Sequence, residues 1–267
     1  VRTAQDGGDR ELAVHVDRCF DCDAHDAMRL FVDGKPLLVD DGDGTHMQAK
    51  LHFADGRPHA LRMELLHRSR DGGVRLQWLA PPAAQLAEAE RAMRVADAVV
   101  AFVGLSPDVE GEALRINVPG FAGGDRTSLD LPAPLRALLE RAAASGKPLI
   151  VVLMSGGAVA LDWAKQHADA ILAAWYPGQA GGTAIAQALA GDTNPAGRLP
   201  VTFYRSVQDL PPFASYMMQG RTYRYFRGTP LYPFGYGLSY TRFAYAAPAL
   251  STSALKAGDT LQVSAEV

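Results

Sequence analysis

The 267-residue sequence has few cysteines, almost no net charge and no long apolar run. Its 26 Lys and Arg against 29 Asp and Glu leave a net charge of −3, so charge gives no reason to expect nucleic acid or an anionic membrane surface as a partner. No apolar run approaches the roughly 20 residues that span a bilayer. The first residues, VRTAQDGGDRE, also lack the basic and apolar regions of a signal peptide. We therefore expect no nucleic-acid partner and no membrane span.

Only two cysteines occur, Cys19 and Cys22, with His15 and His25 close by. The Cys-x2-Cys spacing is compatible with zinc, but a structural zinc site usually shows a second pair of ligands, and none is visible in the sequence. A local disulfide or two free thiols is the favoured interpretation, and a disulfide would suit an exported protein. No metal and no cofactor are expected.

An acidic run at Asp40, Asp41 and Asp43 is a second possible cation site. It lacks the later glutamate of an EF-hand loop. We predict a solvated turn there.

Apolar strands alternate with helices through the middle of the sequence. Helices are predicted over 83–97, 132–146, 162–167 and 181–190, and strands over 98–103, 147–157 and 169–178. The strand around KPLIVVLM is almost continuously apolar, which is typical of a parallel strand buried on both faces. This alternation predicts an α/β fold with a doubly wound, mainly parallel sheet, whose turns after Val103, Met154 and Tyr176 share one edge.

The two ends of the chain differ from this α/β part. Residues 1–80 alternate short strands with Asp-Gly and Gly-Gly turns, which predicts an antiparallel β-sandwich, and Pro81 with Pro82 marks its boundary. The last residues, LSTSALKAGDTLQVSAEV, look like one hairpin of an incomplete β domain. We therefore divide the chain into 1–80, 83–245 and 246–267.

The connection from 105 to 132 has no clear period and exceeds the ~12 to 15 residues beyond which a structureless loop is unusual. It contains Glu110, Glu112, Asp125 and Arg126. Because it follows a strand of the predicted parallel sheet, it lies where such sheets bind ligands. From spacing alone, ordinary surface carboxylates remain the simpler interpretation for Glu110 and Glu112. For Asp125 and Arg126 a role in positioning the loop is favoured over an ordinary surface pair.

Several segments become distinctive when they are taken together and in order. They are VVAFVG, EGE and GGDRTSLDLP, then GKPLIVVLMSGGAVAL, AAWYPGQAGGTAIAQALAGDTNPAGRLPVTF and GRTYRYFRGTPLYPFGYGLSYTRF. The α/β part resembles the C-terminal sandwich domain of glycoside hydrolase family 3, the retaining β-glucosidases and β-xylosidases. The beginning of the chain resembles the protective-antigen-type sandwich that some members insert into this domain. Its end resembles the start of their fibronectin type III-like domain.

The resemblance implies half of a catalytic pair. A retaining glycosidase needs a nucleophilic carboxylate and an acid/base carboxyl group ~5 to 5.5 Å away. The family takes its nucleophilic Asp from a separate N-terminal (β/α)8 barrel, which this sequence does not contain, and its acid/base from the α/β domain. Glu112 matches the acid/base position, although Ala113 and Leu114 stand where many members carry Gly or an aromatic residue. The implied substrate is a β-linked oligosaccharide or an aryl β-glycoside, and the implied location is periplasmic or secreted.

Four further residues are candidates for supporting this site. Glu110 could supply negative charge near Glu112, and Asp125 with Arg126 could fix the loop. Trp175 could stack on a sugar or simply pack in the core. The Ser155-Gly156-Gly157 turn and the RTYRYF segment are assigned structural roles, as a tight turn and as a strand packed on one face.

A second function of a different class remains open from the sequence. The chain could be a non-catalytic carbohydrate-binding or scaffold module. A preceding barrel with a nucleophilic Asp would favour the enzyme, and its absence would favour the module.

Overall fold

The computed structural model describes residues 8–16, 26–41, 46–53, 58–68, 73–79, 82–107, 109–111, 116 and 118–267. The chain divides into two compact units, one made of 1–176 with 204–215 and the other of 177–203 with 216–267. Within the described ranges, no helix combines the length and apolar character that crossing a membrane requires.

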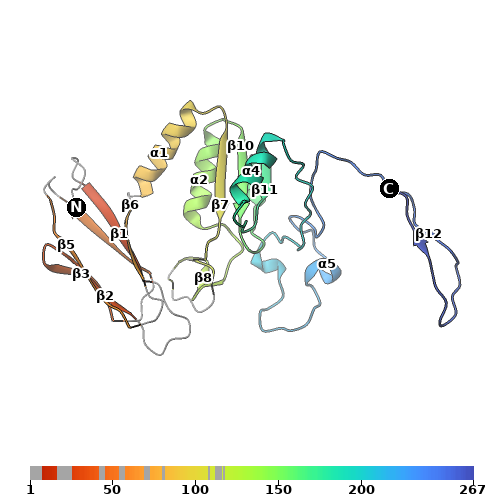
Figure 1. The fold of residues 1–267 in the computed structure, drawn as a ribbon, viewed down its shortest axis with the longest axis horizontal. Coiled ribbons are helices and arrows are strands. Elements are labelled where there is room, and N and C mark those ends of the chain that lie inside the picture. The colour runs from red at the N-terminus through yellow and green to blue at the C-terminus, as the bar shows by residue number, and fades with distance from the viewer. Residues whose placement is uncertain are drawn as a thin grey trace. The chain divides into compact units, whose positions relative to one another are not determined.

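Two three-stranded antiparallel sheets form the beginning of the chain (Figure 1). One has the order β4-β1-β6, with β1 (Gly8–Val16), β4 (His46–Phe53) and β6 (Val74–Leu79). The other has the order β3-β2-β5, with β2 (Ala27–Val32), β3 (Lys35–Asp40) and β5 (Leu61–Leu66). The antiparallel strands predicted for this region are therefore present.

A small apolar core joins these two sheets. Leu12 and Val14 of β1 and Met28 and Leu30 of β2 are fully buried and form one cluster. Alternate residues of a strand point to the same face, so each pair comes from one side of its sheet. Partly buried residues from the remaining strands pack against them: Leu37, Leu38, Leu51, Leu61 and Val74. The sheets thus face each other as a sandwich.

The hairpin between β2 and β3 turns at Asp33 and Gly34, whose φ angles are 50° and 78°. Two positive φ values are the signature of the type I′ turn that Asp-Gly favours. The Asp33 carboxylate also accepts a hydrogen bond from the Ala60 N–H at 2.9 Å and lies 2.7 Å from His59 Nδ1. The His59 contact, followed by the Ala60 bond, lowers the pKa of Asp33 below its ordinary value.

Three parallel strands in the order β11-β10-β7 form the α/β sheet. They are β7 (Val99–Gly104), β10 (Leu149–Met154) and β11 (Ala170–Ala173). The accompanying helices are α1 (Pro82–Val95), α2 (Ala133–Ala144) and α3 (Asp162–His167), with α4 (Gly181–Ala190) in the second unit. The alternation of helices and parallel strands confirms an α/β domain.

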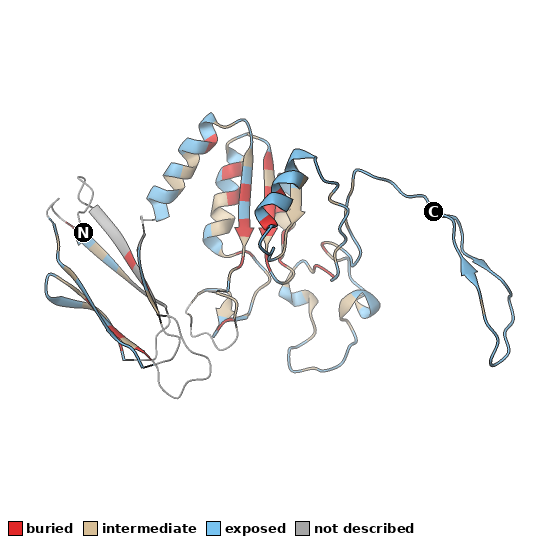
Figure 2. Ribbon diagram, viewed as in Figure 1, coloured by how far each residue is buried: buried red, intermediate tan, exposed pale blue. Residues whose placement is uncertain are grey.

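The core of this domain lies along β10. Leu149, Val151, Val152 and Leu153 are buried, so consecutive side chains of the strand are covered on both faces. Buried residues gather on β10 and on the side of α2 that carries Leu139 (Figure 2).

Three expectations for irregular or polar segments are wrong. RTYRYF contains the short helix α5 (Thr222–Tyr225) instead of a strand, because two-residue alternation over six residues does not distinguish a strand from one helical turn. Tyr223 stacks on Phe234 with ring centroids 4.5 Å apart.

Residues 121–126 form a hairpin within the loop that was expected to be irregular. Asp40 is only 5% exposed, so the acidic run is not wholly a solvated turn.

The C-terminal part of the chain has little regular structure. It contains a 3-10 turn, η1 (Val207–Asp209), and the antiparallel pair β12 (Ala249–Leu250) and β13 (Val263–Ser264). That pair confirms the hairpin predicted there.

Replacing Asp33 by Asn should reduce the thermal stability of the sandwich at neutral pH. The lowered pKa of Asp33 means that its stabilisation is present above about pH 3.9 and is lost as the pH falls through the folded-state pKa. The difference in Tm between wild type and Asp33→Asn should therefore narrow as the pH falls from 7 to about 2. Asp41→Asn is the control, because Asp41 is exposed and its ion pair with Arg29, at 3.8 Å, should contribute little to stability. A pH-independent difference for Asp33→Asn would contradict this assignment.

Gly104 ends β7 with φ 151°, and a Cβ there would lie 1.7 Å from the carbonyl oxygen of Met154. Gly104→Ala should therefore lower the free energy of unfolding by more than about 2 kcal/mol, measured by urea denaturation. Gly146→Ala is the matched control, because Gly146 also has positive φ, 70°, but open space around its Cβ position. It should cost only about 1 kcal/mol. Equal losses would show that backbone conformation, and not the close approach to Met154, fixes the glycine at 104.

Candidate active site

Three chain segments leave the same edge of the parallel sheet. Val103 of β7 lies beside Leu153 of β10, which lies beside Ala173 of β11. Because all three strands run in one direction, the segments that follow them begin side by side. The predicted meeting of these turns at one edge is confirmed.

A short hairpin lies within the segment after β7. The strand β8 (Phe121–Ala122) pairs with β9 (Asp125–Arg126) across Gly123 and Gly124, whose φ angles are 63° and 101°. A Gly-Gly pair between two short strands is a recognised hairpin signal, and it could have identified this element in the sequence. Neighbouring residues of a strand point to opposite sides, and here Asp125 is exposed whereas the Arg126 side chain is only 13% exposed.

Arg126 connects the segments that follow β7 and β10. Its Nη1 donates a hydrogen bond of 2.7 Å to the carbonyl oxygen of Ala158 and lies 3.8 Å from Oε1 of Glu110. Its Nη2 is buried and has no hydrogen-bond partner among the described residues. Burial lowers the pKa of the Arg126 guanidinium, and the negative charges of Glu110 and Asp130 oppose that shift.

Glu110 lies on a tight turn directly after β7. The backbone N–H groups of Val109 and Glu110 both donate to the carbonyl oxygen of Ser106, at 3.0 Å each. The Glu110 side chain is 28% exposed and faces Arg126. Glu112, the predicted acid/base, lies outside the described residues, as do Ala113 and Leu114.

Asp125 is not brought into this group of side chains. Its side chain makes no hydrogen bond or ion pair with any residue that the structure describes, and it points away from the side that Arg126 occupies. Of the predicted supporting pair, only Arg126 contacts the other loops.

The segment after β11 contributes Trp175 and Tyr176. Trp175 has φ 57°, an uncommon backbone conformation for a bulky residue, and it is partly buried. Tyr176 remains 45% exposed. A Cβ on Gly156 would lie 2.8 Å from Cε2 of Tyr176, so the ring rests directly on the glycine backbone.

The Ser155-Gly156-Gly157 segment is a tight turn, as predicted. The Ser155 hydroxyl donates to the carbonyl oxygen of Gly157 at 2.9 Å and lies 3.3 Å from its N–H. The next helix, α3, begins only at Asp162, so this turn does not open a helix.

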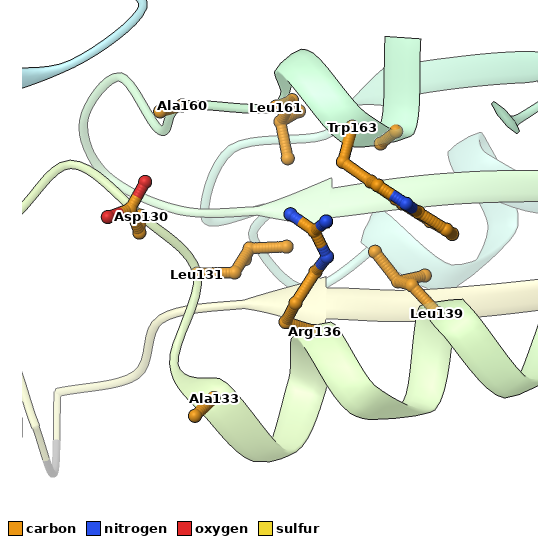
Figure 3. A pocket seen from close by; sticks show the side chains of 9 residues that line it. Asp130, Leu131, Ala133, Arg136, Leu139, Ala160, Leu161 and Trp163 are labelled. Carbon is orange, nitrogen blue, oxygen red and sulfur yellow. The ribbon is translucent and has the colours of Figure 1, made fainter. Parts of the chain in front are cut away.

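A separate pocket of about 370 Å³ lies between α2 and α3 (Figure 3). Its lining contains two charged side chains, Asp130 and Arg136. Asp130 accepts a hydrogen bond from Ser128, and Arg136 donates to Glu140. The Arg136 guanidinium lies 4.7 Å from the ring centroid of Trp163. These groups are paired within the chain, and the pocket contains no carboxylate pair suited to glycoside chemistry.

The possible metal ligands do not form a described site. Cys19, Cys22, His25 and Asp43 lie outside the described residues. Within the described part of the chain, no group of three or more His, Cys, Asp or Glu side chains is arranged to hold a metal ion.

Comparison with known proteins finds relatives that are named β-xylosidases or β-glucosidases. A xylan 1,4-beta-xylosidase of Xylanibacter ruminicola is 54% identical over 140 residues, which are 52% of this chain and 16% of that protein. A periplasmic beta-glucosidase of Salmonella typhimurium is 41% identical over 198 residues, which are 70% of this chain and 25% of that protein. The chain thus spans a quarter or less of the length of these two relatives.

Solved structures share the fold. A β-glucosidase from Erythrobacter marinus, 39% identical, aligns over 70% of this chain and 25% of its own, with a TM-score of 0.58. A β-glucosidase from Kluyveromyces marxianus aligns over 94% of this chain and 31% of its own with a TM-score of 0.69, and at 23% identity it supports the fold alone. The family model for the glycosyl hydrolase family 3 C-terminal domain matches residues 13–240. The chain therefore belongs to the glycosyl hydrolase family 3 C-terminal domain family.

Proposed function

We propose that this chain is part of a retaining, exo-acting β-glycosidase of the β-glucosidase or β-xylosidase type. Its family and the names of its relatives support this class of enzyme. The substrate would be a terminal β-linked sugar of an oligosaccharide or of an aryl β-glycoside. The periplasmic relative supports a periplasmic or secreted location.

In this proposal Glu112 is the general acid/base. It protonates the leaving oxygen in the first step and activates water in the second, while the nucleophilic Asp comes from a (β/α)8 barrel elsewhere in the polypeptide. The acid/base must be protonated at the start of the cycle, so its surroundings must not carry an uncompensated positive charge.

The arrangement around Arg126 is the observation that carries this proposal. The guanidinium donates a hydrogen bond to the Ala158 carbonyl and faces Glu110. These contacts constrain Glu110, and with it the start of the segment that contains Glu112, at the carboxyl edge of the sheet. Glu110 also balances the charge of Arg126. An Arg126 without this partner would favour the ionised form of a neighbouring carboxyl group and weaken it as an acid.

We further propose that residues 1–80 are a protective-antigen-type sandwich inserted into the α/β domain, and that 246–267 begin a fibronectin type III-like domain. The family match covers both the sandwich and the α/β part, which supports an insertion. Val100 and Phe102 of β7 are exposed, Phe102 by 52%, although strands of a doubly wound sheet are usually covered on both faces. Further strands or helices of the longer polypeptide would cover them.

In the full-length protein, Glu112→Gln should lower kcat/KM for substrates with poor leaving groups by about a hundredfold or more, because these need a proton in the first step. Activated aryl β-glycosides should lose less in that step. Added azide should restore turnover and yield a β-glycosyl azide, since a small anion attacks the glycosyl-enzyme without a base. Equal losses on both substrates, or no azide product, would overturn the assignment. If the wild type cleaves neither aryl β-glucosides nor aryl β-xylosides, the non-catalytic module becomes the better description.

Glu110→Gln should change the pH profile more than the maximal rate. Without the negative charge of Glu110, the Arg126 cation is unbalanced and favours the ionised acid/base. The alkaline limb of kcat/KM should therefore move to lower pH. A larger loss of rate than in Glu112→Gln would instead identify Glu110 as the acid/base.

Arg126→Met should lower kcat/KM by about tenfold to a hundredfold through misplacement of the loop. The free energy of unfolding should fall by about 1 to 3 kcal/mol, because the Ala158 carbonyl loses its hydrogen bond. Arg136→Met, on α2, is the control and should leave kcat/KM unchanged. A large loss of stability with unchanged kcat/KM for the folded enzyme would show that Arg126 is only structural.

A further inference from the structure

Tyr176 lies at the carboxyl edge of the sheet, next to a residue with an uncommon backbone conformation. It follows Trp175, whose φ of 57° places a bulky residue in the left-handed region. Such backbone strain persists only where the surrounding structure enforces it, and it often marks a functional position.

The ring of Tyr176 is supported from below by glycine. A Cβ on Gly156 would lie 2.8 Å from Cε2 and 3.3 Å from Cδ2 of Tyr176. Gly156 does not have a positive φ, so its own backbone does not require glycine. The absence of a side chain at 156 is instead explained by the ring that rests on it.

The remainder of the Tyr176 ring is open. The side chain is 45% exposed, and its hydroxyl makes no hydrogen bond within the part of the chain that the structure describes. Tyr176 also lies near Arg126, because Gly157, the residue after the glycine that its ring contacts, has its Cβ position 3.5 Å from Nη1 of Arg126. A rigid aromatic surface with a polar tip therefore borders the side chains that position the acid/base loop.

We propose that Tyr176 contacts the leaving group of the β-glycoside and contributes to the choice between sugar and aryl leaving groups. This inference rests on the proposed function. A general acid stands beside the leaving oxygen, so side chains next to its loop lie on the leaving-group side of the bond, and the glycone is held elsewhere. The apolar face of a sugar or aryl ring stacks on the exposed tyrosine ring.

The test compares three substrates with the full-length enzyme: a β-linked disaccharide, an aryl β-glycoside and the matching β-glycosyl fluoride. Fluoride is a single atom and cannot reach the Tyr176 ring. Tyr176→Ala should lower kcat/KM about tenfold for the disaccharide and the aryl glycoside, and change it less than about twofold for the fluoride. Tyr176→Phe keeps the ring and should retain most of the activity on all three.

Gly156→Ala provides an independent variant, because its methyl group displaces the Tyr176 ring without contacting substrate. It should show the same selective loss on the two large leaving groups. Tyr245→Ala, at another exposed tyrosine, is the matched control and should leave all three values unchanged.

Two results would overturn the inference about Tyr176. Equal losses of kcat/KM on all three substrates in Tyr176→Ala would indicate a structural role, and unchanged values would exclude contact with the leaving group. Both results leave the proposed function standing. Only a wild-type enzyme that is inactive on the fluoride and on the aryl glycoside would contradict the proposed function itself.

Discussion

The buried guanidinium of Arg126 is the interaction on which the carboxyl edge of the sheet depends. Its bond to Ala158 and its approach to Glu110 link the segments after β10 and β7. The Arg126 side chain is only 13% exposed, so its partners within the chain fix its position. Through it the hairpin at 121–126 is held to the segment that follows β10.

Arginine suits this position better than lysine. The planar guanidinium presents several donors in fixed directions, so one side chain can hold a carbonyl and face a carboxylate together. A lysine ammonium also has three donors, but they sit on a compact group at the end of a flexible stem, so their directions are not fixed by a rigid plane. Burial also disfavours the charged form, and the carboxylate of Glu110 opposes that effect.

Close backbone approaches leave space for these side chains. Gly104 passes against the Met154 carbonyl where the loop leaves β7, Gly156 supports the Tyr176 ring, and a Cβ on Gly157 would lie 3.5 Å from Nη1 of Arg126. Each glycine serves a different neighbour: a carbonyl, an aromatic ring and a guanidinium. A Cβ at Gly104 or Gly156 would force its neighbour to move, whereas at Gly157 it would make an ordinary van der Waals contact.

The sequence by itself determined the local elements and the class of fold. Apolar periodicity identified α2, α4 and the doubly buried strand β10, the Asp33-Gly34 pair identified a turn between strands, and family motifs identified the domain. These features depend on neighbours within a few residues or on the order of motifs along the chain that is characteristic of the family. Short alternating segments were less informative, and the helical turn at Thr222–Tyr225 was mistaken for a strand for that reason.

Only the tertiary structure decided which side chains meet. Arg126 and Ala158 are 32 residues apart, and no local pattern specifies that one donates to the other. The sequence indicated Trp175 as the residue that could stack on a sugar and gave no role to the adjacent Tyr176. In the structure Tyr176 is the more exposed of the two residues, and its ring packs against Gly156, which follows the neighbouring strand. Local propensity acts along the chain, whereas a site of this kind is made by contacts between strand ends that only the folded sheet brings together.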